Sequence, residues 1–302
     1  MKRLIAVIGA VAMIGLSLFV RGRIDDDGSG GSTSSTGSSL RIACVPELSN
    51  ECNAVRSDRV AITIEDAATT LQKLDQYDGW LTLDPWPAIA DVQQSRGAGA
   101  PIKLASAPLQ IAVVKERAAV LTTTCGGTIT WKCLGANEGQ PWSGLGGDPL
   151  WGQLKVGLPP KGSAAGLLLY ADAIASYFGR IDYGINDFDA EFRAWQANLR
   201  GAFAEQSPFQ TFVNLLPAAY AAVGTTGAQT LTQVGARADR ITLVDEMARA
   251  VVVLAPTGGR DLRSLAKTSA LQQALQSDGW IGPADAATGL PAAGVLFALL
   301  NG

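Results

Sequence analysis

The chain has 302 residues, of which 47% are hydrophobic and 17% are charged, and its net charge is −3. This composition is typical of a globular protein and excludes a largely disordered one. Because the near-neutral charge includes no basic stripe, nucleic-acid binding is not expected.

The N-terminus predicts a membrane segment followed by a tether. Basic residues flank an uncharged apolar run at 4–20. The run is long enough for a short spanning helix and lacks a clear Ala-x-Ala cleavage site. We therefore expect 1–23 to be an uncleaved anchor, with a cleaved export signal as the alternative. The Gly- and Ser-rich segment 24–39 predicts a flexible linker that keeps 40–302 near the cell membrane. Basic residues at both ends of the apolar run leave its orientation open, and the cysteines favour a location of 40–302 outside the cytoplasm.

Short strands and helices alternate in the rest of the chain. Strands are predicted at 40–45, 59–64, 80–83, 109–114, 155–158, 241–244 and 250–254. Helices are predicted at 66–74 with Asp66 as the cap, and at 161–178, 192–203, 209–223 and 262–276. A turn at 84–87 is expected to stop the third strand. This alternation indicates an α/β protein with mainly parallel sheets.

Four cysteines form two local pairs, Cys44 with Cys52 and Cys125 with Cys133, each eight positions apart. Even numbers and local spacing favour disulfides within each pair, and disulfides persist in oxidising compartments. Two pairs of free buried thiols are the alternative. A metal site is not expected, since the chain has no histidine and no C-x-x-C motif.

The order of the elements resembles that of the type 2 periplasmic-binding fold, found in bacterial extracellular solute-binding proteins. The resemblance covers 40–302 and is carried by the opening strand at 40–45 and three further segments: GWLTLDPW at 79–86, LASAPLQIAVVK at 104–115 and GLPPKGSAAG at 157–166. It implies two α/β lobes, joined by two crossovers, with a ligand cleft between them. By position, lobe 1 would be about 40–108 plus 237–302, and lobe 2 about 109–236.

Ligands of open α/β sheets bind beyond the carboxyl ends of the strands, so the loops after the strands supply the candidate ligand-binding residues. Outside the start of the helix at 161–178, these are Pro46, Glu47, Asp84, Trp86 and Asp245. Two further candidates are Ser106, which precedes the crossover strand, and Thr225, which follows the helix predicted at 209–223. Two of all these candidates have an equally ordinary structural alternative. Trp86 would also serve as a packing anchor, and Asp245 as a salt-bridge partner at a hinge.

The start of the helix predicted at 161–178 is a candidate anion site. A helix N-terminus presents unpaired N–H groups and a partial positive charge. Lys161 would add a full charge, Gly162 would allow a close approach to the backbone, and Ser163 and Ala164 would complete the loop. The alternative is an ordinary N-cap, in which Ser163 serves only its own helix.

The sequence gives little support for an enzymatic function. Without histidine there is no Ser-His-Asp or Cys-His arrangement, and a pair of carboxylates of the glycosidase type is the only plausible chemistry. We therefore expect a protein that is not an enzyme and needs no cofactor.

Two functions remain. The first is a membrane-tethered solute-binding protein that closes on a small polar or anionic ligand and passes it to an ABC permease or a membrane sensor. The second is a non-catalytic envelope interaction module that keeps the fold but has lost solute binding. Such a module would fill its cleft with side chains.

Overall fold

The computed structural model describes residues 39–94, 99–204 and 206–302. The anchor predicted at 1–23 and all but the last residue of the linker predicted at 24–39 lie outside the described residues. In the described part of the chain, no helix has the length and apolar character needed to cross a bilayer.

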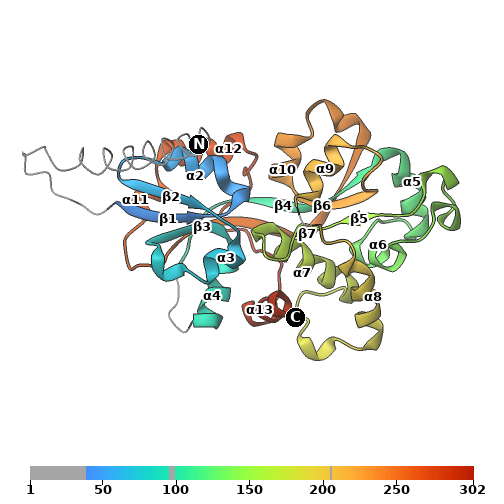
Figure 1. The fold of residues 1–302 in the computed structure, drawn as a ribbon, viewed down its shortest axis with the longest axis horizontal. Coiled ribbons are helices and arrows are strands. Elements are labelled where there is room, and N and C mark those ends of the chain that lie inside the picture. The colour runs from blue at the N-terminus through green and yellow to red at the C-terminus, as the bar shows by residue number, and fades with distance from the viewer. Residues whose placement is uncertain (1–38, 95–98, 205) are drawn as a thin grey trace, which may run out of the picture. The chain divides into compact units, whose positions relative to one another are not determined.

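One seven-stranded sheet runs through the described chain in the order β2-β1-β3-β7-β4-β6-β5 (Figure 1). Its strands are β1 (Leu40–Cys44), β2 (Val60–Ile64), β3 (Gly79–Asp84), β4 (Ile102–Val114), β5 (Val156–Gly157), β6 (Ala222–Thr226) and β7 (Ile241–Pro256). All of β6 and nearly all of β3 are buried, as expected for strands covered on both faces.

The sheet is mixed, which corrects the prediction of mainly parallel sheets. β1 runs parallel to β2 and β3, and β5 runs parallel to β6. The long strands β4 and β7 run antiparallel to each other, β7 also to β3, and β4 also to β6. The reason is connectivity, because the chain crosses the sheet once along β4 and returns along β7.

β4 and β7 join two lobes. β3 pairs with the second half of β7, at 251–256, whereas β6 pairs with the second half of β4, at 109–113. Between these regions the pairing of β4 with β7 shifts register, between Pro108 and Gln110. We call the part around β1, β2 and β3 the first lobe and the part around β5 and β6 the second lobe.

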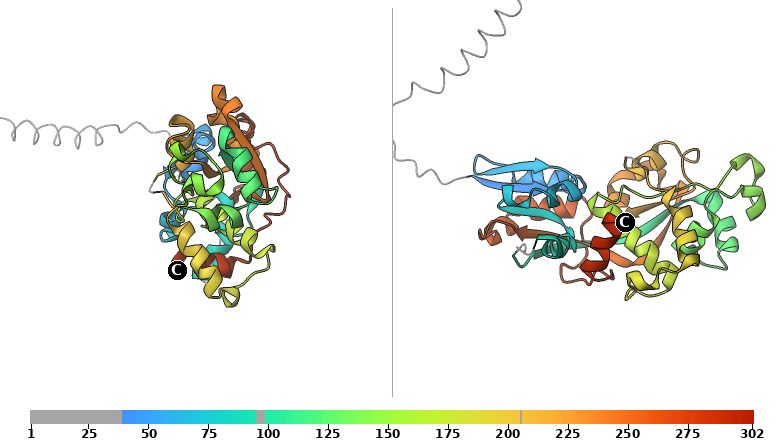
Figure 2. Two further views of the ribbon diagram at one scale, coloured as in Figure 1. Left: turned by 90° about the vertical axis from the view of Figure 1, so that its right-hand side faces the viewer. Right: turned by 60° about the horizontal axis from the view of Figure 1, so that its bottom comes forward.

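Helices cover both lobes. The first lobe carries α2 (Ser49–Val55), α3 (Ala67–Leu71), α4 (Trp86–Gln94), α11 (Arg263–Ala266) and α12 (Ser269–Ser277). The second carries α5 (Lys115–Thr124), α6 (Trp131–Asn137), α7 (Ala164–Phe178), α8 (Ala190–Arg200), α9 (Pro208–Asn214) and α10 (Gly227–Gln233). The C-terminal helix α13 (Ala293–Asn301) packs against α4 of the first lobe and α7 of the second (Figure 1, Figure 2).

Several predicted elements have different bounds in the structure. The helix predicted at 209–223 ends at Asn214, because Pro217 cannot donate a helical hydrogen bond and the buried strand β6 follows. The turn predicted at 84–87 leads directly into α4, whose first turn tolerates Pro87. The strands predicted at 241–244 and 250–254 are one strand, β7. The helix predicted at 262–276 is divided into α11 and α12.

The central helix α7 confirms the prediction made for 161–178. Its first twelve residues are buried, because the helix packs against α6, α13, β6 and β7. The Ser163 hydroxyl caps it by accepting a hydrogen bond from the Gly166 N–H at 3.1 Å. Gly179 ends it in the left-handed conformation, with φ 68°.

Both predicted local disulfides are present. Cys44 at the end of β1 bonds to Cys52 in α2, and Cys125 after α5 bonds to Cys133 in α6. Each bond fixes a short loop, and the first holds the start of α2 beside the carboxyl end of β1.

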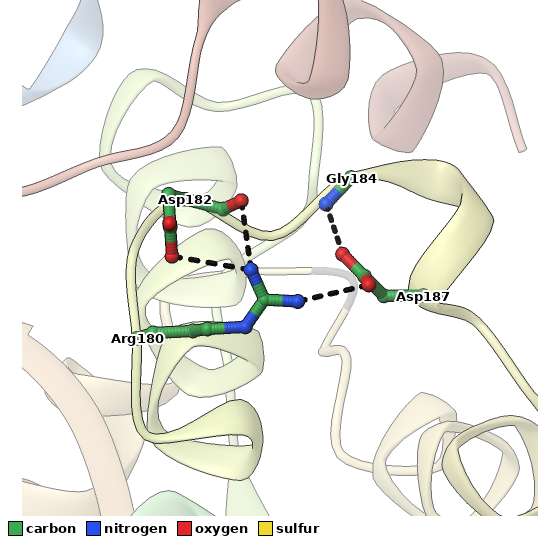
Figure 3. A network of polar contacts seen from close by, with 4 residues as sticks. All are labelled: Arg180, Asp182, Gly184 and Asp187. Carbon is green, nitrogen blue, oxygen red and sulfur yellow. Dashed lines mark hydrogen bonds and ion pairs between the residues drawn. The ribbon is translucent and has the colours of Figure 1, made fainter.

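An exposed ion network organises the loop after α7 (Figure 3). The Arg180 guanidinium lies 3.2 Å from the Asp182 carboxylate and 2.8 Å from that of Asp187. The other carboxylate oxygen of Asp187 accepts a hydrogen bond from the Gly184 N–H at 2.7 Å. The loop that follows α7 therefore supplies the carboxylate partners of Arg180.

Candidate functional site

A cavity of about 470 Å³ lies between the two lobes. The first lobe lines it with Pro46, Glu47, Ser49, Asn50, Asp66, Asp278 and Trp280. The second lobe lines it with Pro159, Pro160, Ser163, Ala165, Gln206, Ser207, Gln210, Ala228, Gln229, Thr232 and Gln233. Both walls therefore contribute polar side chains to one space, which is the usual arrangement of a small-molecule site.

The sheet topology explains why these residues meet. Glu47 follows β1, Asp66 follows β2, Ser163 follows β5, and α10 with Gln229 follows β6. The loops beyond the carboxyl ends of strands from both lobes thus face the same cavity, as the crevice rule for α/β sheets predicts.

The first-lobe wall is fixed by a bond between distant parts of the chain. The Asn50 side-chain amide, in α2, donates to the Asp278 carboxylate at 2.8 Å. Asp278 and Trp280 directly follow α12, which packs on α2. The second-lobe wall is supported in the same way, because the buried Thr225 hydroxyl donates to the Gln229 side-chain oxygen at 3.2 Å.

The cavity carries negative charge. Three carboxylates line it, those of Glu47, Asp66 and Asp278, and no lysine or arginine does among the described residues. Lys161, predicted to add a positive charge here, turns away, and its ammonium donates to the Leu299 carbonyl of α13 at 3.2 Å. The field inside the cavity therefore favours a cation over an anion.

The N-terminus of α7, our candidate anion site, is met by a carboxylate of the protein itself. The Ala165 N–H donates to Glu47 Oε1 at 2.9 Å, across the boundary between the lobes. Burial raises the pKa of Glu47, and the hydrogen bond from Ala165 partly opposes that rise. Its other oxygen is buried without a partner.

Two further bonds attach the start of α7 to the first lobe. The Gly162 carbonyl accepts from the Ala68 N–H at 3.0 Å, and the Ala164 carbonyl accepts from the Trp86 indole at 3.0 Å. Gly162, Ala164 and Trp86 do not line the cavity. Trp86 is fully buried and packs edge-on against Trp80, with ring centroids 6.2 Å apart, so it is the packing anchor named as its alternative.

The remaining predicted residues lie outside the cavity lining. Asp84 forms an ion pair with Lys103 at 3.5 Å. The Ser106 hydroxyl is buried and donates to the Pro283 carbonyl at 2.8 Å. Asp245, offered as a hinge salt-bridge partner, instead accepts a hydrogen bond from the Gln110 side chain at 2.6 Å, beside the register shift of the crossover strands.

A buried carboxylate stands behind the first-lobe wall. Glu51 in α2 is fully buried, and neither of its carboxylate oxygens has a hydrogen-bond partner. Burial raises its pKa to about 7; the nearby Asp278 charge adds to this rise, while the backbone N–H of Glu51 and the Trp280 indole oppose it. No pattern in the sequence marks Glu51.

Sequence reasoning placed Pro46, Glu47 and Ser163 in loops that do line the cavity, but it missed much of both walls. Asp278 and Trp280 come from the far end of the chain and reach the cavity only because α12 packs on α2. α10 was not predicted at all. The one available signal was the crevice rule applied to β6, but no strand was predicted there, and the helix predicted at 209–223 overlaps the first two residues of β6.

No protein-family model matches the sequence, and no curated protein matches it. Solved structures do match. A putative spermidine/putrescine ABC transporter protein from Listeria monocytogenes has a TM-score of 0.53 and 11% identity, over 82% of this chain and 83% of that chain. An ABC transporter protein from Clostridium perfringens has a TM-score of 0.48 and 9% identity, over 87% and 95% of the two chains.

A mutant OxyR from Corynebacterium glutamicum, bound to H2O2, has a TM-score of 0.46 and 11% identity, over 92% and 76% of the two chains. At such identities a likeness shows the fold alone, and the Listeria structure is the one that carries it. The described chain therefore has the type 2 periplasmic-binding fold, with two α/β lobes and a cavity between them.

Proposed function

We propose that this protein is an extracytoplasmic solute-binding protein whose lobes close on a small polar ligand. The observation that carries the proposal is the cavity of about 470 Å³ whose two walls, one from each lobe, both present polar side chains. Its volume lies within the range of small-molecule sites. The fold supports the same function, because it places loops from both lobes around one crevice.

The charge of the cavity selects the class of ligand. An anion would meet Glu47, Asp66 and Asp278 with no lysine or arginine of the described chain in the lining, so we do not retain the anionic ligand of the sequence analysis. An amine would find carboxylates for its ammonium groups and the indole of Trp280 for its methylenes. A neutral sugar is the next best fit, since amides and hydroxyls make up much of the second-lobe wall.

The cellular setting is part of the proposal. Two disulfides are stable only where the compartment is oxidising, which supports a location outside the cytoplasm. The apolar run at 4–20 would hold the protein at the membrane, either permanently or until export is complete. There a non-catalytic binding protein would hand its ligand to an ABC permease or to a membrane sensor.

The interaction-module alternative predicts a cleft that is filled with side chains. Trp86, the residue best placed by sequence to fill it, is instead buried at the start of α4, where its indole donates to the Ala164 carbonyl of α7. The cavity is left open, and this favours solute binding over docking.

The proposal is tested by thermal unfolding of the purified full chain against putrescine, spermidine, choline, maltose and glutamate. The Listeria protein is described as a putative spermidine/putrescine transporter, which is why both amines are included. A true ligand at about a hundred times its dissociation constant should stabilise the fold by about 2.7 kcal/mol, a rise in Tm of a few degrees. A shift with amines or maltose supports the proposal, a shift with glutamate alone refutes the charge argument, and no shift at all refutes solute binding.

A further inference from the structure

An arginine of the second lobe is buried and forms no ion pair with any described residue. Arg117 lies in α5, and its side chain is 6% exposed. Its guanidinium carbon is 5.4 Å from the ring centroid of Trp142 and 5.4 Å from that of Trp151. The two indoles meet edge-on at 87°, so they form a fixed corner around the guanidinium.

The described residues leave a buried donor of this guanidinium without an acceptor. Arg117 Nε is buried with no hydrogen-bond acceptor. The ion pairs found among the described residues all involve other cations. Burial lowers the pKa of Arg117, and the adjacent Glu116 charge opposes this only in part. Arg180, by contrast, is exposed and has two carboxylates in its own loop (Figure 3).

A small cavity opens beside the unpartnered arginine. It measures about 280 Å³ and is lined by Arg117, Trp151, Gly152, Gln153, Lys155, Ala218 and Ala219. It therefore presents two cations and one amide, and no carboxylate of the described chain lines it. None of these residues lines the cavity between the lobes, so the two spaces differ in place and in charge.

We propose that Arg117 and Lys155 form a second binding site, which takes a small oxyanion. The planar guanidinium donates in a fork that matches carboxylate and phosphate oxygens, and the indoles hold it in place. The exposed Lys155 adds a second positive charge at the mouth of the cavity. The stacking on two indoles by itself accounts for the position of Arg117, but it provides no acceptor for Nε. The carboxylates whose charges act on the two cations, Glu116 on Arg117 and Glu138 on Lys155, do not line the cavity.

The cavity of about 280 Å³ has room for a phosphate, a sulfate, or the carboxylate of a small acid, and its two cations favour such an oxyanion. The same phosphate chemistry is available free in solution or on a lipid headgroup, and both sources are compared below. This site is independent of the solute site proposed above, and its test does not require that the cleft bind anything.

The test is a titration of the purified full chain with sodium phosphate, with sodium chloride at matched ionic strength as the reference. Intrinsic tryptophan fluorescence, to which Trp142 and Trp151 contribute two of the seven indoles, follows the titration, and calorimetry gives the affinity. We expect saturable binding of phosphate beyond any effect of chloride. A second arm uses vesicles of phosphatidylglycerol, with phosphatidylcholine vesicles as reference, to learn whether a headgroup replaces free phosphate.

Variants decide where the phosphate binds. Lys155→Gln is exposed and should fold normally, and we expect it to weaken phosphate binding by about two- to fivefold. Arg117→Lys keeps the charge but loses the fork, and should weaken binding by about tenfold or more. Lys132→Gln, whose ammonium lies over the Tyr177 ring in the same lobe, is the matched control and should bind as the wild type does.

Thr232→Trp, which places a bulky side chain in the cleft, should also leave phosphate binding unchanged. Saturable phosphate binding that both Lys155→Gln and Arg117→Lys weaken supports the proposal. The proposal is overturned if phosphate acts no differently from chloride, if Lys155→Gln binds as tightly as Lys132→Gln, or if Thr232→Trp abolishes the signal.

Discussion

Replacing Glu51 by glutamine should stabilise the protein at neutral and higher pH. Glu51 is fully buried behind the first-lobe wall, neither of its oxygens has a partner, and its pKa is raised to about 7. Because the folded protein binds this proton more tightly than the unfolded chain does, the group favours folding below the unfolded pKa of 4.5. That contribution is lost as the pH rises through about 7.

The size of the effect follows from the two pKa values. Moving from 4.5 to about 7 corresponds to about 3 kcal/mol once the group is fully ionised. Most of this is lost between about pH 5 and pH 8, so the wild type should lose about 2 to 3 kcal/mol over that range through Glu51 alone. The Glu51→Gln variant cannot ionise there. Any cost of burying the amide is independent of pH and cancels in the comparison.

The assay is thermal unfolding of the wild type and of Glu51→Gln at pH 5 and pH 8. The difference in Tm between variant and wild type should increase by roughly 5–10 °C from the lower to the higher pH. Glu116→Gln, an exposed position on α5, is the matched control and should show no such increase. An increase that is absent in Glu51→Gln, or equal in the two variants, would refute the claim that Glu51 is buried and unpartnered.

Two other substitutions test the packing of α7 and the charge of the cleft. A Cβ on Gly166 would clash with the backbone carbonyl that precedes the helix, so Gly166→Ala should lower stability by about 1–3 kcal/mol in a denaturant melt. Gly294→Ala, in α13 with open space around it, should instead raise stability by up to about 1 kcal/mol, and equal effects would contradict this account. Asp278→Asn should weaken the binding of putrescine by about fivefold in calorimetry, while the exposed Asp239→Asn should not; an unchanged affinity in Asp278→Asn would show that its charge does not face the ligand.

Local patterns in the sequence were sufficient for the elements whose residues decide their own structure. The capped and largely apolar helix at 161–178 and the strands before residue 85 were predicted within a few residues. The two disulfides followed from spacing alone. The segment after Asn214 was not readable in this way, because the apolar run of β6 lies close to a preceding helix and fits either period.

The candidate site was harder to predict than the fold, for two physical reasons. Two residues of its first-lobe wall, Asp278 and Trp280, depend on the packing of α12 against α2, which no local pattern records. The prediction of an anion site at the start of α7 left out a partner from the other lobe. The Glu47 carboxylate already accepts a hydrogen bond from the Ala165 N–H. The sequence analysis named both the loop that contains Glu47 and the start of α7 as candidate sites, but it did not predict that they bind each other.

The most direct test of the account asks whether a solute binds in the cavity between the lobes. Thr232→Trp places a large side chain in the cavity from α10. Thr123→Trp is the matched control, because it places the same side chain on the exposed face of α5, outside the cavity. Both threonine hydroxyls donate only to carbonyls of their own helix, at 3.0 and 3.1 Å for the shortest bond, so the loss of the hydroxyl is matched. The measurement is calorimetric binding of putrescine, or of whichever panel compound gives the largest Tm shift. We expect the wild type and Thr123→Trp to bind with equal affinity and Thr232→Trp to bind at least about tenfold more weakly, a loss of about 1.4 kcal/mol. Equal binding by all three proteins would contradict the central claim.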